Sequence, residues 1–155
     1  MQAEDRLIHF STELIFKPIQ LKTPLLQKLY YELSQTKAAY DSSELSLAGQ
    51  PPRFYSRRGR TQSLALFLPD RCVLVEEWVD IALVDFYEKV REVAARALDV
   101  LDLPMFVAQT ATLRSTFALT HFDDARVFLM DHMCNQRDRI SPWFQRPIGT
   151  GGLRF

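Results

Sequence analysis

Two hydrophobic spacings divide the chain: strict alternation in some stretches, and recurrence every three or four residues in others. Over residues 7–17 the alternation places Ile8, Phe10 and Leu14 on one side, which predicts a strand with one apolar face. Further stretches rich in β-forming side chains predict strands over residues 53–58, 62–68, 72–78 and 105–120. Helical spacing predicts helices over residues 24–40, 80–103 and 123–133.

Capping signals and connectors refine these elements. Thr23 and Asp80 are the predicted N-caps of the first two helices, and Pro24 suits the first helical position. Lys89 and Arg96 are predicted on the solvent side of the second helix, each four residues after an acidic residue. A surface loop is predicted over 41–52, a turn at Gly59, and an antiparallel hairpin at Pro69-Asp70-Arg71.

The resulting order, β-α-β-β-β-α-β-α, has too few helices for a parallel doubly wound sheet. It predicts an α+β fold, a mostly antiparallel sheet with helices on one face, as an elaborated ferredoxin-like architecture. A length of 155 residues with 47% hydrophobic and 25% charged residues is that of one ordinary domain. We assign it to residues 1–134, with 135–155 as an irregular tail that packs on the domain or leads to a missing segment.

Charge and targeting signals are unremarkable. Nineteen basic residues balance nineteen acidic ones, so no overall field attracts nucleic acid or an anionic membrane. The N-terminus lacks the order of a signal peptide, and no apolar run reaches the length of a membrane span. Cys72 lies in an apolar strand as a small hydrophobe. These features predict a cytoplasmic protein without a membrane partner.

Two groups of residues are candidate partner-binding sites. The first is a basic and aromatic cluster, whose guanidinium groups suit phosphates and whose ring can stack on a base: Arg53, Tyr55, Arg57, Arg58 and Arg60. Strand alternation divides this cluster between two faces, and arginines at a hairpin tip are commonly just solvated. The second group, Ile140, Trp143 and Phe144, is an apolar patch that either contacts another chain or covers the core.

Catalytic, metal and cofactor signals are weak, and we predict none of the three. The acidic and histidine residues of 121–134 lack the spacing of a metal site, and Cys134 and His132 diverge on a helix. Glu76 and Glu77 are predicted on opposite sides of a strand. Residues 149–152 lack the Lys-Ser/Thr pair of a phosphate-binding loop. An enzyme centred on Arg114, His121 and Asp131 is the lowest-ranked hypothesis.

The segment from Leu64 to Arg114 resembles a sporadically distributed family of uncharacterised bacterial proteins. The residues that carry the resemblance are the apolar strand, turn and second strand of Leu64–Leu74 and the later strand Val107–Arg114. At the end of that strand the family pattern has an asparagine, where this chain has Arg114-Ser115-Thr116. The resemblance implies a bacterial origin and this order of elements, and it implies no catalytic residue.

The leading functional hypothesis is therefore a non-enzymatic domain that binds a protein partner or another copy of itself. Edge strands of an open antiparallel sheet favour such binding, because their unpaired backbone groups accept a further strand. Nucleic-acid binding through the arginine cluster is the alternative. The sequence does not distinguish a complete protein from a fragment of a longer one.

Overall fold

The computed structural model describes residues 4–45 and 49–118, with side chains for 7–45 and 49–115. Residues Leu7–Ser115 form one compact unit. Of a second unit, Met1–Arg6 and Thr116–Phe155, the structure describes only the backbone at 4–6 and 116–118. The predicted helix over 123–133, the domain end at 134 and the tail 135–155 lie outside the described residues.

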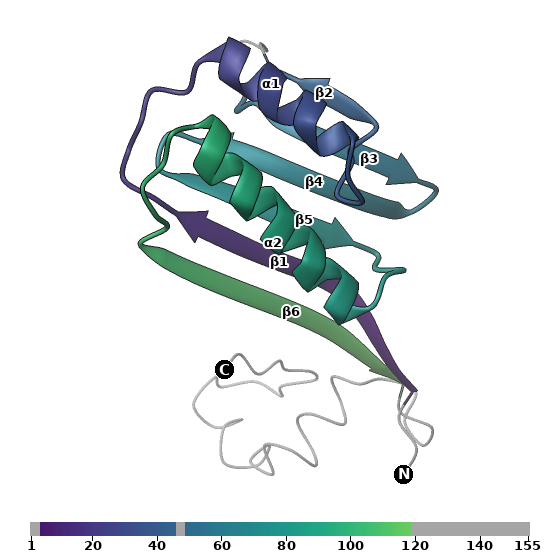
Figure 1. The fold of residues 1–155 in the computed structure, drawn as a ribbon. Helices are drawn as coiled ribbons and strands as arrows, with labels where there is room; N and C mark the ends of the chain where they lie inside the picture. The colour runs from purple at the N-terminus through teal and green to yellow at the C-terminus, as the bar shows by residue number, and fades with distance from the viewer. Residues whose placement is uncertain (1–3, 46–48, 119–155) are drawn as a thin grey trace, which may run out of the picture. The chain divides into compact units, whose positions relative to one another are not determined.

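Six strands and two helices make up the described fold (Figure 1). In chain order they are β1 (Glu4–Ile15), α1 (Thr23–Ser34), β2 (Ser42–Glu44), β3 (Arg53–Arg58), β4 (Thr61–Leu68), β5 (Arg71–Glu77), α2 (Leu83–Val100) and β6 (Ala108–Ala118). The sheet order is β2-β3-β4-β5-β1-β6, and the neighbouring strands run antiparallel. The predicted α+β class with an antiparallel sheet is confirmed.

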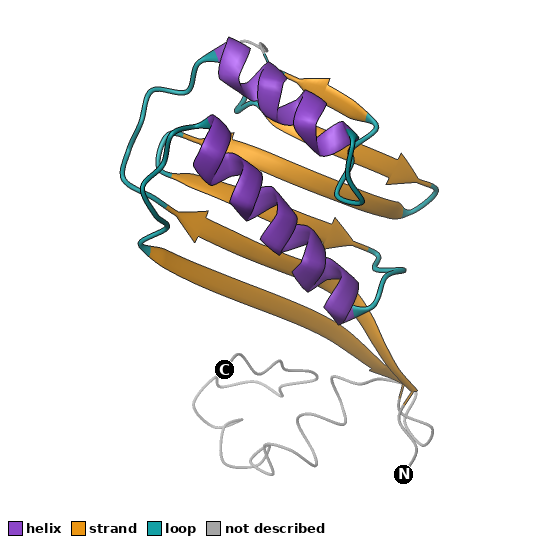
Figure 2. Ribbon diagram, in the orientation of Figure 1, coloured by secondary structure: helices purple, strands orange, loops and turns teal. Residues whose placement is uncertain are grey.

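Both helices lie on the same face of the sheet, as predicted (Figure 2). Alternation along each strand sends every second side chain toward them. On β1, Phe10 packs against Phe86 of α2, with ring centroids 5.4 Å apart. On β3, Phe54 lies 5.2 Å from Tyr30 of α1. One hydrophobic core therefore fills the space between the sheet and the two helices.

Two tight hairpins set the register of the central strands. Leu68 pairs with Arg71, so Pro69 and Asp70 alone form the β4–β5 turn. Arg58 pairs with Thr61, and Gly59 has φ +60°, as the first central residue of a type II′ turn requires. The hairpin and the glycine turn predicted from the sequence are both confirmed.

The structure corrects the segment after α1. The first helix ends at Ser34, six residues before the predicted end, because Thr36 bonds back to the Leu33 carbonyl and the chain turns. That turn buries Tyr40, whose ring lies 6.1 Å from Phe54. The predicted loop over 41–52 contains a short strand, β2, which pairs with β3. Three residues are too few to show an alternation pattern in the sequence.

Both predicted N-caps are wrong. The N-cap residues are Lys22 and Ala82, and neither makes a side-chain capping bond. Because α1 begins at Thr23, Pro24 is its second residue, one position later than predicted, and still lies in the first turn. Ahead of α2, Ile81 packs against the core, and Ala82 keeps an extended backbone. Tertiary packing of this connector therefore delays the start of α2 to Leu83.

Candidate functional site

The sheet face turned away from the helices is unusually apolar. In β4 and β5 the residues facing the helices are buried, and the alternate residues on the other face are partly exposed. We call the apolar part of this surface the open face. Its residues are Ile15, Tyr55, Leu64, Leu66, Leu68, Val73 and Val75.

The strand register makes the open face continuous. Leu64 lies opposite Val75, and Leu66 lies opposite Val73. Tyr55 of β3 extends the patch because it pairs with Leu64. A solvent-facing sheet surface normally carries polar side chains, so a contiguous apolar surface indicates a contact with something else. No helix or strand of the described residues covers it.

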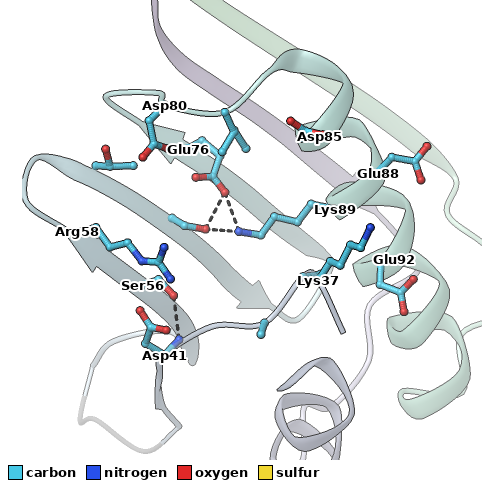
Figure 3. A pocket seen from close by; sticks show the side chains of 15 residues that line it. Lys37, Asp41, Ser56, Arg58, Glu76, Asp80, Asp85, Glu88, Lys89 and Glu92 are labelled. Atoms are coloured by element: carbon cyan, nitrogen blue, oxygen red, sulfur yellow. Dashed lines mark hydrogen bonds and ion pairs between the residues drawn. The ribbon is translucent and has the colours of Figure 1, made fainter. Parts of the chain in front are cut away.

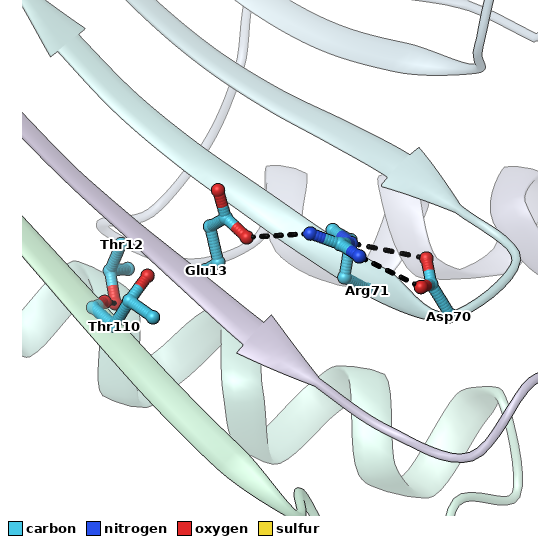
Figure 4. A network of polar contacts seen from close by, with 5 residues as sticks. All are labelled: Thr12, Glu13, Asp70, Arg71 and Thr110. Carbon is cyan, nitrogen blue, oxygen red and sulfur yellow. Dashed lines mark hydrogen bonds and ion pairs between the residues drawn. The ribbon is translucent and has the colours of Figure 1, made fainter.

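Charged pairs surround the open face. Arg71 lies between Glu13 and Asp70, with Nη1 2.9 Å from Glu13 Oε2 and Nη2 2.9 Å from Asp70 Oδ2 (Figure 4). Hydrogen bonds from Arg71 lower the pKa of Asp70, and the same contacts raise the pKa of Arg71. These groups are partly exposed, so the pairs add little stability and mainly give the rim both signs of charge.

The arginine cluster predicted as a partner site is divided between three environments. Arg53 is on the open-face side of β3, where Nε donates to Glu44 at 2.6 Å and the guanidinium lies 6.0 Å from the Tyr55 ring. Arg57 is exposed on the same side, whereas Arg58 lines a cavity on the helix side. Arg60 is exposed in the β3–β4 turn. The predicted division between two faces is confirmed, and no single arginine patch forms.

The remaining candidates are placed only in part. Arg114 lies on β6 with an exposed side chain. Its hypothetical catalytic partners, His121 and Asp131, lie outside the described residues. The same is true of the apolar patch Ile140, Trp143 and Phe144.

A polar cavity of about 700 Å³ lies on the helix side of the sheet. Its floor is a cross-strand row in which Ser63 pairs with both Ser56 and Glu76. Walls come from the segment after α1, from the β5–α2 connector and from α2 (Figure 3). This is the place where polar residues replace the apolar ones that elsewhere face the helices.

A buried ion pair lies at this floor. Lys89 Nζ of α2 is 2.8 Å from Glu76 Oε1, and the side chains are 15% and 5% exposed. Ser63 donates to the same carboxylate at 2.7 Å and also contacts Lys89. The ammonium lies 4.4 Å from the centre of the Tyr40 ring. Lys89 is therefore not on the solvent side of α2, contrary to the sequence prediction, whereas the Glu92–Arg96 pair is present as predicted.

The sequence contained a signal for this pair. It was overlooked because Lys89 follows an acidic residue by four positions, which is typical of an exposed helical ion pair. Glu76 continues the buried phase of Cys72 and Leu74, so a carboxylate had to enter the core side of the sheet. Its predicted separation from Glu77 is confirmed, because Glu77 faces the other side and bonds to His9 Nδ1 at 2.7 Å. A buried carboxylate requires a partner, and only the fold reveals that this partner is Lys89.

Ser63 and Lys89 do not form a nucleophilic pair. A serine nucleophile needs a neighbouring base that accepts its proton. Here the amine is paired with a carboxylate as an ammonium ion, and the hydroxyl donates to that same carboxylate. The arrangement is a structural network that joins α2 to the sheet at the cavity floor.

Two buried ionisable side chains, Tyr40 and Cys72, lie next to the network. Burial, together with nearby Cys72 and Glu76, raises the pKa of Tyr40 well above its ordinary value. The Tyr40 hydroxyl has no hydrogen-bond partner among the described residues. Burial raises the pKa of the Cys72 thiol to about 12, so Cys72 is an unreactive core residue, as predicted.

A second, apolar groove of about 440 Å³ runs between α2, β1 and β6. Exposed hydrophobic side chains line it: Val84 and Tyr87 from the first turns of α2, and Leu113 from β6. Leu83, the first residue of α2, is also 47% exposed here. Sequence spacing assigned all these residues correctly to elements and did not reveal the groove.

Comparison with known proteins gives no relative. No protein-family model, curated protein or solved structure matches the chain. The described helices also lack the length and hydrophobicity needed to cross a bilayer.

Proposed function

We propose that this protein is a self-associating, non-enzymatic domain and that the open face of its sheet is the interface. The observation that carries the proposal is the apolar row of Leu64, Leu66, Val73 and Val75 on the face turned away from α1 and α2. Burying such side chains against another surface contributes about 25 cal/mol for each Å² removed from water. Two sheets that stack face to face lie roughly 10 Å apart and interdigitate these side chains.

A second copy of the chain is the occupant that the charge distribution favours. The residues around the open face carry both signs: Arg53, Arg57 and Arg71 against Glu13, Glu44, Asp70 and Glu77. A nearly balanced rim neither repels an identical rim nor attracts a strongly charged partner. In a two-fold dimer the same patch contributes from both sides, so the apolar centre meets itself.

The test is the oligomeric state of the full chain in solution. We expect light scattering to show a dimer whose fraction rises with protein concentration. Leu66→Lys places a charge at the centre of the interface and should weaken the dimer by more than about tenfold. The substitution is tolerated in a monomer, because Lys fits an outward strand position; circular dichroism checks the fold.

Leu113→Lys is the matched control, because it adds the same charge at the apolar groove on β6. We expect this variant to dimerise as the wild type does. A dimer lost in Leu113→Lys but retained in Leu66→Lys would move the interface to that groove. A wild type that stays monomeric at all concentrations would show that another segment or another protein covers the open face.

Nucleic-acid binding is the alternative function. Its support is limited to the exposed Arg57 and Arg60, since Arg53 is paired with Glu44 and Arg58 faces the cavity. Binding of a single-stranded oligonucleotide that weakens steeply with added salt would favour it.

Three finer predictions accompany the proposal. A cytoplasmic location agrees with the buried free thiol of Cys72. A bacterial origin rests on the sequence resemblance alone. An elaborated ferredoxin-like architecture is supported by the unit β5-α2-β6, whose strands lie on either side of β1.

A further inference from the structure

A serine, a histidine and a glutamate form a hydrogen-bonded chain at the border of the open face. His9 Nδ1 lies 2.7 Å from Glu77 Oε1, and His9 Nε2 lies 2.9 Å from Ser11 Oγ. Strand alternation places His9 and Ser11 on the same side of β1, and the strand register sets Glu77 directly opposite His9. We propose that this arrangement makes Ser11 a reactive serine, which accepts an acyl group from an activated ester.

The chemistry of these groups fixes the direction of each hydrogen bond. An ionised carboxylate only accepts hydrogen bonds, so His9 Nδ1 carries the proton that it donates to Glu77. In a neutral imidazole the other nitrogen is then unprotonated, so Nε2 accepts the hydroxyl proton of Ser11. Ser11 therefore has a base within reach, and Glu77 holds that base in the required tautomer.

The exposure of the three side chains suits this role. The His9 side chain is only 8% exposed, so water competes little for the imidazole. Ser11 is partly exposed, so a reagent can reach its hydroxyl. Ser63 lacks this arrangement, because the amine beside it is already an ammonium ion paired with a carboxylate.

The reaction is an acyl transfer that needs no further reactant. Ser11 Oγ attacks the carbonyl carbon of the ester while its proton moves to His9 Nε2. The bond between the carbonyl carbon and the leaving oxygen then breaks, and the leaving alcohol takes the proton from Nε2. One ester and one serine hydroxyl thus give one acyl-serine and one alcohol.

The acyl-serine is a lasting modification of the protein in this proposal. Strand β1 lies between β5 and β6, so its backbone N–H groups serve the two neighbouring ladders. The described sheet therefore leaves no backbone donor pair free beside Ser11 to stabilise an oxyanion during hydrolysis. A single acyl transfer agrees with a non-enzymatic domain, and it does not depend on self-association, because all three residues belong to one chain.

The neighbouring side chains favour an aliphatic acyl group. Ser11 lies opposite Val75, and Val75 lies opposite Leu64 on the open face. An aliphatic chain attached to Ser11 can lie over these two side chains and remove apolar surface from water. The acyl donor that fits is therefore an activated ester of an uncharged aliphatic acid.

Labelling of the full chain with para-nitrophenyl butyrate tests the proposal. Protein kept below the dissociation constant of the dimer leaves the open face uncovered. We expect peptide mass spectrometry to find the butyryl group on Ser11, formed at least about a hundredfold faster than on Ser42. Ser42 is the internal control, because it lies on the same sheet face opposite Tyr55, is also partly exposed and is three strands away from β1. Equally slow labelling of both serines would overturn the proposal.

Glu77→Gln tests the positioning role of the carboxylate. The side chain is 44% exposed and keeps its size, and circular dichroism checks the fold. A glutamine amide both donates and accepts, so it no longer fixes the tautomer of His9, and labelling of Ser11 should slow at least about tenfold. Nitrogen-15 NMR at pH 8, where a histidine ring is ordinarily neutral, gives a second readout. We expect the proton on Nδ1 in the wild type and both tautomers in the variant.

Glu13→Gln is the matched control, because Glu13 lies on the same face of β1 and pairs with Arg71 instead of His9. We expect labelling of Ser11 within about twofold of the wild type, since a partly exposed charge that does not touch the imidazole is largely screened. Equal slowing by both glutamine variants would show a general charge effect and refute the assignment. A wild-type neutral ring protonated on Nε2, or undiminished labelling in His9→Gln, would refute it as well.

Discussion

The pair of Glu76 and Lys89 connects the sheet to α2 through charge in an otherwise apolar interior. Its side chains are almost fully removed from water, so each ion depends on the other and on Ser63. Such a pair adds little net stability compared with two hydrophobic residues, yet loss of one partner leaves an uncompensated buried charge. The orientation of α2 on the sheet is therefore sensitive to this contact.

Lys89→Met should lower the free energy of unfolding by about 3–5 kcal/mol, because the Glu76 carboxylate stays buried without its cation. Chemical denaturation monitored by circular dichroism measures the change. In the double variant Lys89→Met with Glu76→Gln, most of that loss should be recovered. A double variant no more stable than the single one would contradict the ion-pair explanation.

Lys28→Met provides the control for loss of a lysine from a helical pair. Lys28 Nζ lies 3.7 Å from Glu32, and its side chain is 59% exposed. We expect a change below about 0.5 kcal/mol, since exposed pairs four residues apart contribute only a few tenths.

Cys72 should be protected from thiol reagents in the folded protein. The variant Cys134→Ser leaves Cys72 as the single cysteine. Because burial raises the pKa of this thiol to about 12, little thiolate exists at neutral pH. We expect a disulfide reagent at pH 8 to react only as fast as the protein unfolds, and at once in denaturant. Rapid reaction under native conditions would show that this strand is accessible.

Burial of Cys72 also makes the free energy of unfolding depend on pH in the alkaline range. Unfolding returns the Cys72 pKa to its ordinary value of 9.0, so between pH 9 and about 12 the unfolded state binds fewer protons than the folded state. Stability from this group is complete below pH 9 and falls as the pH rises, by at most about 1.4 kcal/mol per pH unit. Denaturation of Cys72→Ala over pH 8–10 should show a shallower decline than the wild type.

At the scale of elements, α2 has two different surfaces along its length. Its later turns pack on the sheet through Val93 and Ala97, which are fully buried. Its first turns present Val84 and Tyr87, each at least 60% exposed, to the apolar groove beside β6. One amphipathic pattern therefore serves both core packing and a surface groove.

Two valine substitutions on this helix distinguish the surfaces. Val93→Ala should destabilise the protein by about 2 kcal/mol, because it leaves a cavity in the core. Val84→Ala, at a position 62% exposed, should change stability by less than about 0.5 kcal/mol. Thermal denaturation of both variants measures the difference. A large loss in Val84→Ala would show that the groove is filled in the native protein.

At the scale of the whole molecule, the two described helices, α1 and α2, cover one side of the sheet, and no helix of the described residues covers the other. In most antiparallel sheets that side is polar, and the monomer is complete. Here its centre is aliphatic, so the monomer exposes surface that association would bury. Self-association and folding stability should therefore be linked.

This linkage predicts a melting temperature that depends on protein concentration. A dimer that forms only from folded chains raises the melting temperature as concentration increases over a roughly hundredfold range. Leu66→Lys should shift this dependence to protein concentrations at least about tenfold higher, because it weakens association. Calorimetric scans of both proteins provide the measurement, and a concentration-independent wild type would contradict the proposed dimer.

Much of the fold could be predicted from local sequence. Alternation and helical spacing gave five of the six strands and both described helices, and the residues of the two hairpin turns dictated where the strands reverse. These features depend on neighbouring residues alone. Helix ends were predicted wrongly, because packing of Tyr40 and Ile81 overrides the local capping signals. The β2 strand was missed because three residues are too few to show an alternation.

The sites were harder to predict from the sequence, because each joins residues far apart in the chain. Sequence predicted the two faces of the arginine strand, yet it gave Arg53 no partner and placed Lys89 in solvent. What the sequence determined by itself is the periodicity that makes each element amphipathic. Only the tertiary structure decided which apolar face the helices cover and which stays open, and which carboxylate Lys89 meets, because those outcomes depend on the order in which the strands pair.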